Sequence, residues 1–183
     1  MGTQIRYFFK DVRALLGRHE RRIFIVWFTP AFIGIWWYRF ERSFYLLFGR
    51  YYSILRIPLM PLGALILAYS RLDINYKADI GPGLAVKHPA LGVVVSAYVR
   101  AGKNLSMVGG NVIGVAKRCT QSEFIIGDNC TLGANAVILG PVTLGNNILI
   151  GASSCVVKSY DGNNLVLTGV PAQPVIKGSL SFS

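Results

Sequence analysis

The sequence contains little histidine, little cysteine and few acidic residues. Its 183 residues include two histidines, His19 and His88, so imidazole chemistry has few candidates and a three-histidine zinc site is excluded. The number of cysteines is odd and no CxxC pair occurs, which argues against a disulfide framework or a zinc knuckle and favours a reducing compartment. The cysteines are Cys119, Cys130 and Cys155.

Long hydrophobic runs are also missing. No stretch of about 18 residues is free of both charges and helix breakers, so a simple membrane-spanning protein is not expected. Two shorter apolar segments remain, 23–38 with three tryptophans and 57–69 with two prolines. Each segment could lie at a lipid interface or pack on protein, and we favour the lipid interface. No small-residue cleavage site follows the first segment, so we expect the N-terminus to be retained.

Positive charge is concentrated in the first part of the chain. The net charge is +11; residues 1–72 hold eleven Lys and Arg against three acids, and residues 73–183 hold eight against five. The basic part is also the aromatic part, and residues 3–18 have the spacing of an amphipathic helix. Aliphatic neighbours favour an anionic membrane surface over nucleic acid. We therefore predict that 1–72 is a helical, membrane-associated region and that the protein is cytoplasmic, peripheral on the inner face of the cytoplasmic membrane.

From residue 73 onward an aliphatic residue opens successive units of six. Glycine often follows it, and small or aliphatic residues recur in the fifth place, a pattern typical of one short strand and one tight turn per unit. Two insertions break the period, at 88–94 and 115–124, and insertions in a solenoid are frequently functional. The clearest units open at Ile126, Leu132, Ile138, Leu144, Ile150 and Val156.

These repeats resemble those of the hexapeptide-repeat acyltransferases. The resemblance covers about 73–176 and rests on DINYKADIGPGLAVKHPALGVVV, IIGDNCTLGANAVILGPVTLGNNILIGASSCVV and TGVPAQPVI. Within the family the chain is similar to serine acetyltransferases and to relatives that acetylate exopolysaccharides, such as the colanic acid acetyltransferases. The resemblance implies a mainly β fold, with a left-handed parallel β-helix over 73–183 and a short N-terminal α-helical apolar region. It also implies a homotrimer with active sites between subunits.

The resemblance further implies that His88 is the general base. Imidazole would remove the proton of an acceptor hydroxyl as the oxygen attacks the thioester of acetyl-CoA, without an acyl-enzyme and without a metal. Position alone leaves a structural turn residue equally open. Cys130 and Cys155 fall inside regular hexads and are interpreted as core or face residues. The backbone N–H groups of Gly109 and Gly110 are candidates to meet the oxyanion.

The acetyl-CoA contacts are likewise implied by the resemblance. The pantetheine arm would lie along a groove between coils where small residues allow close approach, although the glycines serve the turns equally well. A lysine would reach a phosphate. The candidates are Gly133, Gly151, Ala152, Gly169, Pro171 and Ala172, with Lys158 for the phosphate.

Two departures from the serine enzymes bear on the acceptor. Lys87 stands where those enzymes have an aspartate, and the loop 115–124 lacks their second histidine. A lysine would repel the amino group of serine. We therefore predict transfer to a saccharide hydroxyl on a free or lipid-linked exopolysaccharide or capsule precursor. The alternatives are a serine O-acetyltransferase of cysteine biosynthesis and, as a non-enzyme, a membrane-associated trimeric scaffold.

Overall fold

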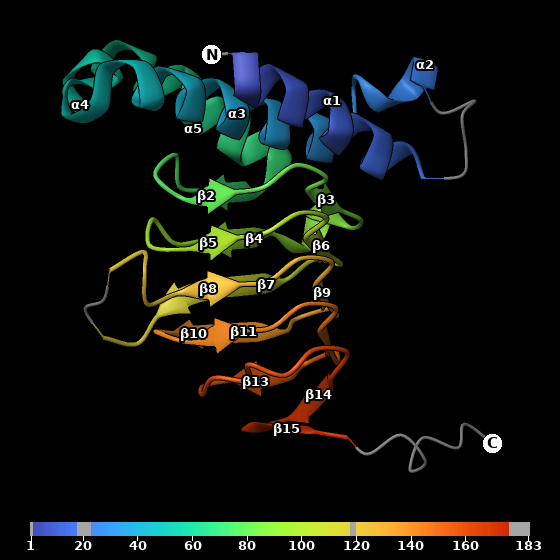
Figure 1. The fold of residues 1–183 in the computed structure, drawn as a ribbon. Helices are drawn as coiled ribbons and strands as arrows, with labels where there is room; N and C mark the ends of the chain where they lie inside the picture. Colours follow the sequence, from blue (N-terminus) through green and yellow to red (C-terminus); the bar gives the residue numbers. More distant parts are fainter. Residues whose placement is uncertain (1, 18–22, 118–119, 176–183) are drawn as a thin grey trace.

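The chain forms a stack of short strands with a layer of helices across one end (Figure 1). The structure is a computed structural model and describes residues 2–17, 23–117 and 120–175. His19 and Cys119 therefore lie outside the described residues. Strands occupy the chain from Leu72 to Pro174 and the helices precede them, so the predicted class, a parallel β-helix with an N-terminal helical region, is confirmed.

In the described part of the chain, five α-helices make up the layer, which we call the cap. The predicted amphipathic helix is α1, and α3 begins where the Thr29 hydroxyl accepts a hydrogen bond from the Phe32 amide at 3.3 Å. The helix α3 ends at Gly49, whose φ of 54° suits glycine. The bounds are α1 Gly2–Leu16, α2 Ile23–Val26, α3 Pro30–Phe48, α4 Tyr52–Leu55 and α5 Met60–Ser70, with 3₁₀ turns η2 Gly49–Tyr51 and η3 Ile57–Leu59.

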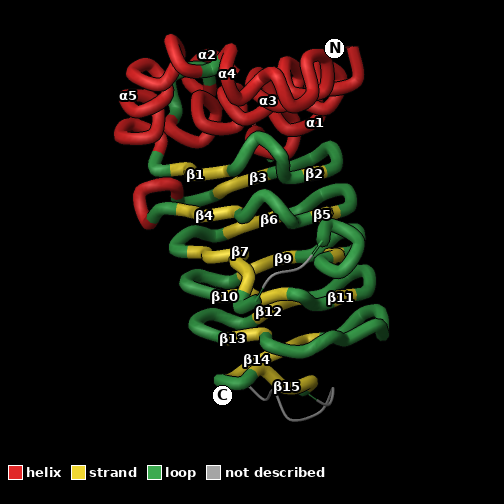
Figure 2. The backbone as a smooth tube through the Cα atoms, turned by 90° about the vertical axis from the view of Figure 1, so that its left-hand side faces the viewer, coloured by secondary structure: helices red, strands yellow, loops and turns green. Residues whose placement is uncertain are grey.

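The strands form three parallel sheets, one on each face of the solenoid (Figure 2). The first sheet contains β1 Leu72–Ile74, β4 Val93–Val95, β7 Asn111–Val115, β10 Val137–Gly140 and β13 Cys155–Val156. The second contains β2 Asp79–Ile80, β5 Arg100–Ala101, β8 Ile125–Ile126 and β11 Thr143–Leu144. The third contains β3 Ala85–Val86, β6 Ser106–Met107, β9 Thr131–Leu132, β12 Leu149–Ile150, β14 Val166–Gly169 and the antiparallel β15 Ala172–Pro174.

The strand register confirms the period of six and both insertions. Val137 pairs with Cys155, 18 positions later, which is three hexads per coil. Leu72 pairs with Val93, so the first insertion adds three residues to its coil. Arg100 pairs with Ile125, so the second adds seven.

The aliphatic residue that opens each hexad points into the solenoid. Ile126, Leu132 and Ile138 are at most 1% exposed, and Cys130 in a fifth position is fully buried. Each coil contributes the same inward positions, so the side chains stack along the axis. The stack forms one continuous hydrophobic core that extends up to Ile35 and Tyr38 of the cap.

An asparagine ladder supports one corner of the coils. Asn104, Asn129, Asn147 and Asn164 all have a φ between 56° and 59°, in the left-handed region that asparagine tolerates. The side-chain nitrogen of each of the first three donates to the side-chain oxygen of the next asparagine, at 2.8, 3.0 and 3.0 Å. The ladder thus links successive coils at this corner through side-chain hydrogen bonds.

The cap covers the open edge of the first coil with polar side chains. Arg39 donates to the carbonyls of Ile80 and Gly81, both at 2.7 Å, and pairs with Asp11 at 2.8 Å. The Asp11 carboxylate accepts from the amides of Gly83 and Leu84 at 2.7 and 2.8 Å. An unpaired sheet edge exposes such groups, so this buried pair completes the edge.

The two apolar segments of the sequence lie in the cap and contact protein on one side only. Ala31 and Ile35 are buried, whereas Phe24 is 83% and Leu65 is 70% exposed. Within the described residues no single helix is long and apolar enough to cross a bilayer. Two consecutive helical segments, Pro30–Leu55 and Ile57–Ser70, are together long and apolar enough to do so, but the chain bends by 79° between them.

Candidate active site

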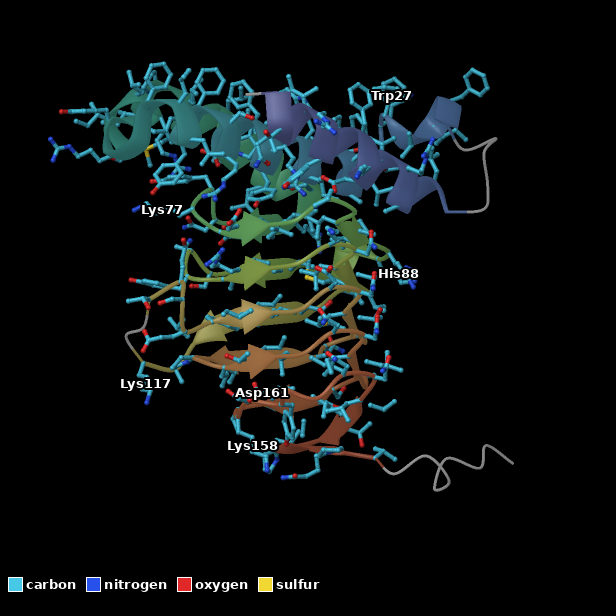
Figure 3. The ribbon with its side chains drawn as sticks, viewed as in Figure 1. Trp27, Lys77, His88, Lys117, Lys158 and Asp161 are labelled. Carbon is cyan, nitrogen blue, oxygen red and sulfur yellow. The ribbon has the colours of Figure 1, made fainter. Side chains whose placement is uncertain are left out.

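His88 lies at the corner where the chain passes from the third sheet to the first. Its amide donates to the Val108 carbonyl at 2.7 Å, and its carbonyl accepts from the Leu91 amide at 3.2 Å, across the 3₁₀ turn η4 Pro89–Leu91. The residue is exposed, and its side chain projects from the solenoid (Figure 3). The first insertion therefore presents the imidazole to solvent just below the cap.

Gly109 lies directly beneath the His88 carbonyl. Its φ is 140°, and a Cβ there would lie 2.3 Å from the His88 oxygen, so only glycine fits. The buried Asn111 side chain accepts from the Gly109 amide at 2.9 Å and donates to the Gly133 carbonyl at 2.7 Å. Asn111 thus fixes the backbone under His88, a role that the sequence reading missed because β7 begins outside the clear hexads.

The expectation that Gly109 and Gly110 donate to an oxyanion is wrong for this structure. The Gly109 amide is bonded to Asn111, and the Gly110 amide donates to the Gly92 carbonyl at 2.6 Å. Both donors are already satisfied inside the corner.

A row of small residues descends along the same corner as His88. The Gly133 amide donates to the Ile150 carbonyl and the Gly151 amide to the Leu167 carbonyl, both at 2.8 Å. A Cβ on Gly133 would lie 2.6 Å from the Ala152 nitrogen, and one on Gly151 would lie 2.8 Å from the Thr168 methyl carbon. The structure thus brings together four of the predicted contacts, Gly133, Gly151, Ala152 and Gly169, which follow β9, β12 and β14 at one corner.

Of the other predicted contacts, Ala172 pairs with Gly169 and Pro171 follows in the same turn, whereas Lys158 does not join this row within one chain. Lys158 lies across the solenoid from His88 (Figure 3), and its ammonium donates to the Gln173 side chain at 3.2 Å. Ala172 is 1% exposed, so its methyl group faces the interior. Pro171 is exposed in the turn between β14 and β15.

A pocket of about 840 Å³ opens beside His88, between the cap and the first two coils. Its walls are mostly apolar and come from α1, α2, the start of α3 and strand β3, with Leu15, Ile25 and Val86 among them. Lys87 and His88 supply polar groups, together with Asn104 and Ser106. The sequence could not reveal this pocket, because its walls come from segments about 70 residues apart along the chain.

The second insertion lies away from this pocket. Gln121 donates from its amide nitrogen to the carbonyls of Lys77 and Ala97 at 2.6 and 2.7 Å, which ties the loop to the coils above it. Hydrogen bonds from Thr120 lower the pKa of Glu123. Figure 3 shows Lys117 of this loop on the side opposite His88. Within one chain the described residues of this loop therefore do not line the His88 pocket.

The cysteines and acids form no second centre in the described part of the chain. Burial raises the pKa of Cys130, whose side chain is enclosed by the solenoid, and Cys155 is half-buried in β13. No group of three or more His, Cys, Asp or Glu among these residues could hold a metal ion. His88 therefore stays the candidate around which the site is described.

The fold and the repeat define a hexapeptide-repeat β-helix. Residues 124–158 match the family model described as the hexapeptide repeat of succinyl-transferase. Serine acetyltransferase 5 of Arabidopsis thaliana is 40% identical over 72 residues, which are 39% of this chain and 23% of that protein. The chain therefore spans less than a quarter of the curated relative that it matches.

Solved structures cover nearly the whole chain. The Neisseria gonorrhoeae serine acetyltransferase superposes with a TM-score of 0.80 at 27% identity, over 96% of this chain and 67% of that one. Soybean serine acetyltransferase complexed with serine gives 0.77 at 25% identity, over 96% and 70%. A serine acetyltransferase complex with CoA gives 0.76 at 25% identity, over 95% and 70%. The chain is thus similar to a hexapeptide-repeat transferase model over residues 124–158 and to serine acetyltransferase structures over nearly its whole length.

Proposed function

We propose that this chain transfers an acetyl group from acetyl-CoA to a hydroxyl, with His88 as the general base. The observation that carries the proposal is the placement of an exposed imidazole at the top of the small-residue row and at the edge of an 840 Å³ pocket. One corner of the solenoid thus offers a base, a strip for a thioester cofactor and a space for an acceptor.

The chemistry needs one proton acceptor and two aligned substrates. The His88 imidazole takes the hydroxyl proton while the oxygen attacks the thioester carbonyl, and collapse of the tetrahedral intermediate expels the CoA thiolate. The thiolate then takes up a proton, and the product is the O-acetyl ester. Neither Cys130, enclosed in the core, nor Cys155 is needed as a nucleophile.

The row of Gly133, Gly151, Ala152 and Gly169 would hold the pantetheine arm. Ala152 and Gly169 are exposed and Gly133 and Gly151 are half-buried, so no large side chain covers this corner, and the match to a CoA complex of serine acetyltransferase supports this use. Lys158 and Lys117 both lie away from His88 within one chain (Figure 3). Within a homotrimer a neighbouring subunit could bring them to the site, so we include trimer formation in the proposal.

Two acceptors are candidates, and different observations favour each. The comparisons favour L-serine, because the matched structures are serine acetyltransferases, one of them complexed with serine. A saccharide hydroxyl is supported by Lys87, whose cation would repel the serine ammonium, and by the apolar walls of the pocket. The acetyl transfer itself is common to both.

An acceptor screen with labelled acetyl-CoA tests the proposal. L-serine, free sugars and lipid-linked glycans are each offered to the full chain, and product formation is counted. We expect His88→Ala to lower the rate on the preferred acceptor by roughly 10²–10⁴-fold, because a general base typically accelerates a reaction by that factor. The matched control is His19→Ala, which removes the chain's other histidine and should leave the rate unchanged.

Each outcome decides a separate part. Full activity in His88→Ala would overturn the mechanism. Transfer to L-serine at the highest rate would exclude the saccharide. The absence of acetyl-CoA binding and of transfer to every acceptor would leave the non-enzymatic trimeric scaffold.

A further inference from the structure

The outer surface of the cap is apolar and has no partner within the chain. We call the outward side of α1–α3 the cap face and define it by six exposed side chains. Figure 3 shows Trp27 and a line of aromatic rings on the side of the helices turned away from the β-helix. The defining residues, all exposed, are Ile5, Phe9, Phe24, Trp27, Phe28 and Trp36.

The cap face is continuous rather than scattered. A groove of about 370 Å³ runs between α1 and α3, lined by Ile5, Phe9 and Trp36 among others. Ring contacts extend it in both directions, from Trp27 to Phe32 with centroids 5.0 Å apart and from Trp36 to Phe40 at 5.6 Å. An apolar surface of this extent marks an interaction site.

The charges exposed around this face are of one sign. Among the described residues of the helices the two acids are Asp11 and Glu41, and both are buried, paired with Arg39 and Arg56. The exposed charged residues in the same helices and turns are cations, Arg6, Lys10, Arg13 and Arg50. Arg6, Lys10 and Arg13 follow one another at helical spacing on α1, beside Ile5 and Phe9.

We propose that the cap face binds an anionic lipid bilayer at its interface. Aromatic and aliphatic side chains with a cationic border are the combination that such a surface attracts. A second copy of this chain fits less well, because pairing two cap faces would bring like charges together. This inference goes beyond acetyl transfer and does not depend on it.

The geometry suits a peripheral protein. The cap lies across the end of the solenoid, so the β-helix extends away from the bound surface (Figure 1). Copies related by an axis parallel to the solenoid would present their cap faces to one plane, and simultaneous binding would add avidity. Ile25 of α2 is exposed and also lines the His88 pocket, which places the pocket next to the bound surface.

Vesicle cosedimentation of the purified full chain tests the proposal. The probes are vesicles of phosphatidylcholine alone and of phosphatidylcholine with phosphatidylglycerol, at low and high salt. We expect binding to the anionic vesicles and weaker binding at high salt. Phe24→Ser with Phe28→Ser should lower binding by at least about tenfold, because two aromatic side chains no longer leave water. The matched control is Val170→Ser, which changes a similarly exposed residue at the far end of the solenoid.

A charge series gives the second arm. Replacing Arg6, Lys10 and Arg13 by Gln should weaken binding to anionic vesicles by roughly 100-fold, since each surface cation strengthens it about fivefold. The control with equal charge loss replaces Lys103, Lys117 and Lys158 by Gln and should bind as the parent does.

Three results would overturn the proposal. The first is no sedimentation with anionic vesicles, and the second is equal binding by the Phe24→Ser, Phe28→Ser protein. The third is a doubling of particle mass in light scattering that the same double variant abolishes, which would assign the face to a second copy. Acetyl transfer to a soluble acceptor, measured without lipid, reports on the proposed enzyme separately.

Discussion

The β-helix encloses a largely aliphatic core, whereas the cap buries charged side chains beside its apolar ones. The solenoid encloses aliphatic residues such as Ile138 and Leu132, whereas the inner side of the cap buries Asp11, Arg39 and Glu41. The outer side of the cap, in turn, exposes Phe24 and Leu65. The difference follows from the backbone: inner coils pair with coils above and below, but the first coil has an open edge that needs polar partners.

The position of the cap therefore requires a buried ion pair, between Arg39 and Asp11. Burial raises the pKa of Asp11, and the neighbouring Arg39 opposes that rise. The pair is retained because four backbone groups of the first coil, at Ile80, Gly81, Gly83 and Leu84, depend on it. Asp11 and Arg39 thus mark the open sheet edge, while the apolar residues of the cap divide between the core, as at Ile35, and the exposed surface, as at Phe24.

Breaking the inner side of the cap should have the largest effect. Arg39→Met leaves the Asp11 carboxylate buried without its cation, so the free energy of unfolding should fall by about 3–5 kcal/mol. Urea denaturation followed by circular dichroism measures the loss. The control is Arg6→Met, which removes an exposed cation and should change stability by less than about 0.5 kcal/mol. Equal effects of the two variants would contradict the role of the pair.

A leucine comparison sharpens the contrast between the two regions. Leu132→Ala opens a cavity in the fully buried solenoid core and should cost about 2–5 kcal/mol. Leu65→Ala removes the same atoms from an exposed position on α5 and should cost less than about 0.5 kcal/mol in lipid-free solution. The same urea titration measures both. A large cost at Leu65 would mean that α5 is covered by another copy of the chain.

Thiol labelling gives the smallest effect and concerns the solenoid alone. In a Cys119→Ser background, iodoacetamide should label the half-buried Cys155 before Cys130. Burial raises the pKa of Cys130, so little thiolate is present at mildly alkaline pH, and the core also blocks access. Mass spectrometry of digested protein follows the two sites. Faster labelling of Cys130 would show that the core opens readily.

Much of the fold and part of the site could be read from the sequence. The hexads from Ile126 to Val156 place one aliphatic residue inside the solenoid every six positions, because each face of the coil repeats the same short strand. The same register places Gly133 and Gly151 at one corner. His88 opens the first insertion, and the structure puts it at that corner.

Other features depended on contacts that no local pattern records. The Gly109 and Gly110 amides looked available until Asn111 and the Gly92 carbonyl were seen to accept from them. Lys158 was expected near CoA. It follows β13 of the first sheet, whereas His88 follows β3 of the third sheet, so the two residues lie at different corners of the solenoid. The asparagine ladder requires the coils to be stacked before its members can meet.

The sequence by itself determined the β-helix, its 18-residue coil and the two insertions, because a short-range period repeats the same local geometry in every unit; the choice of His88 as general base rests on the family resemblance. Only the tertiary structure decided which side of the cap is polar, which small residues share a corner with His88 and where the 840 Å³ pocket opens. Those features arise where segments far apart in the chain come together, and the hexad period of one segment carries no information about the partner it will meet.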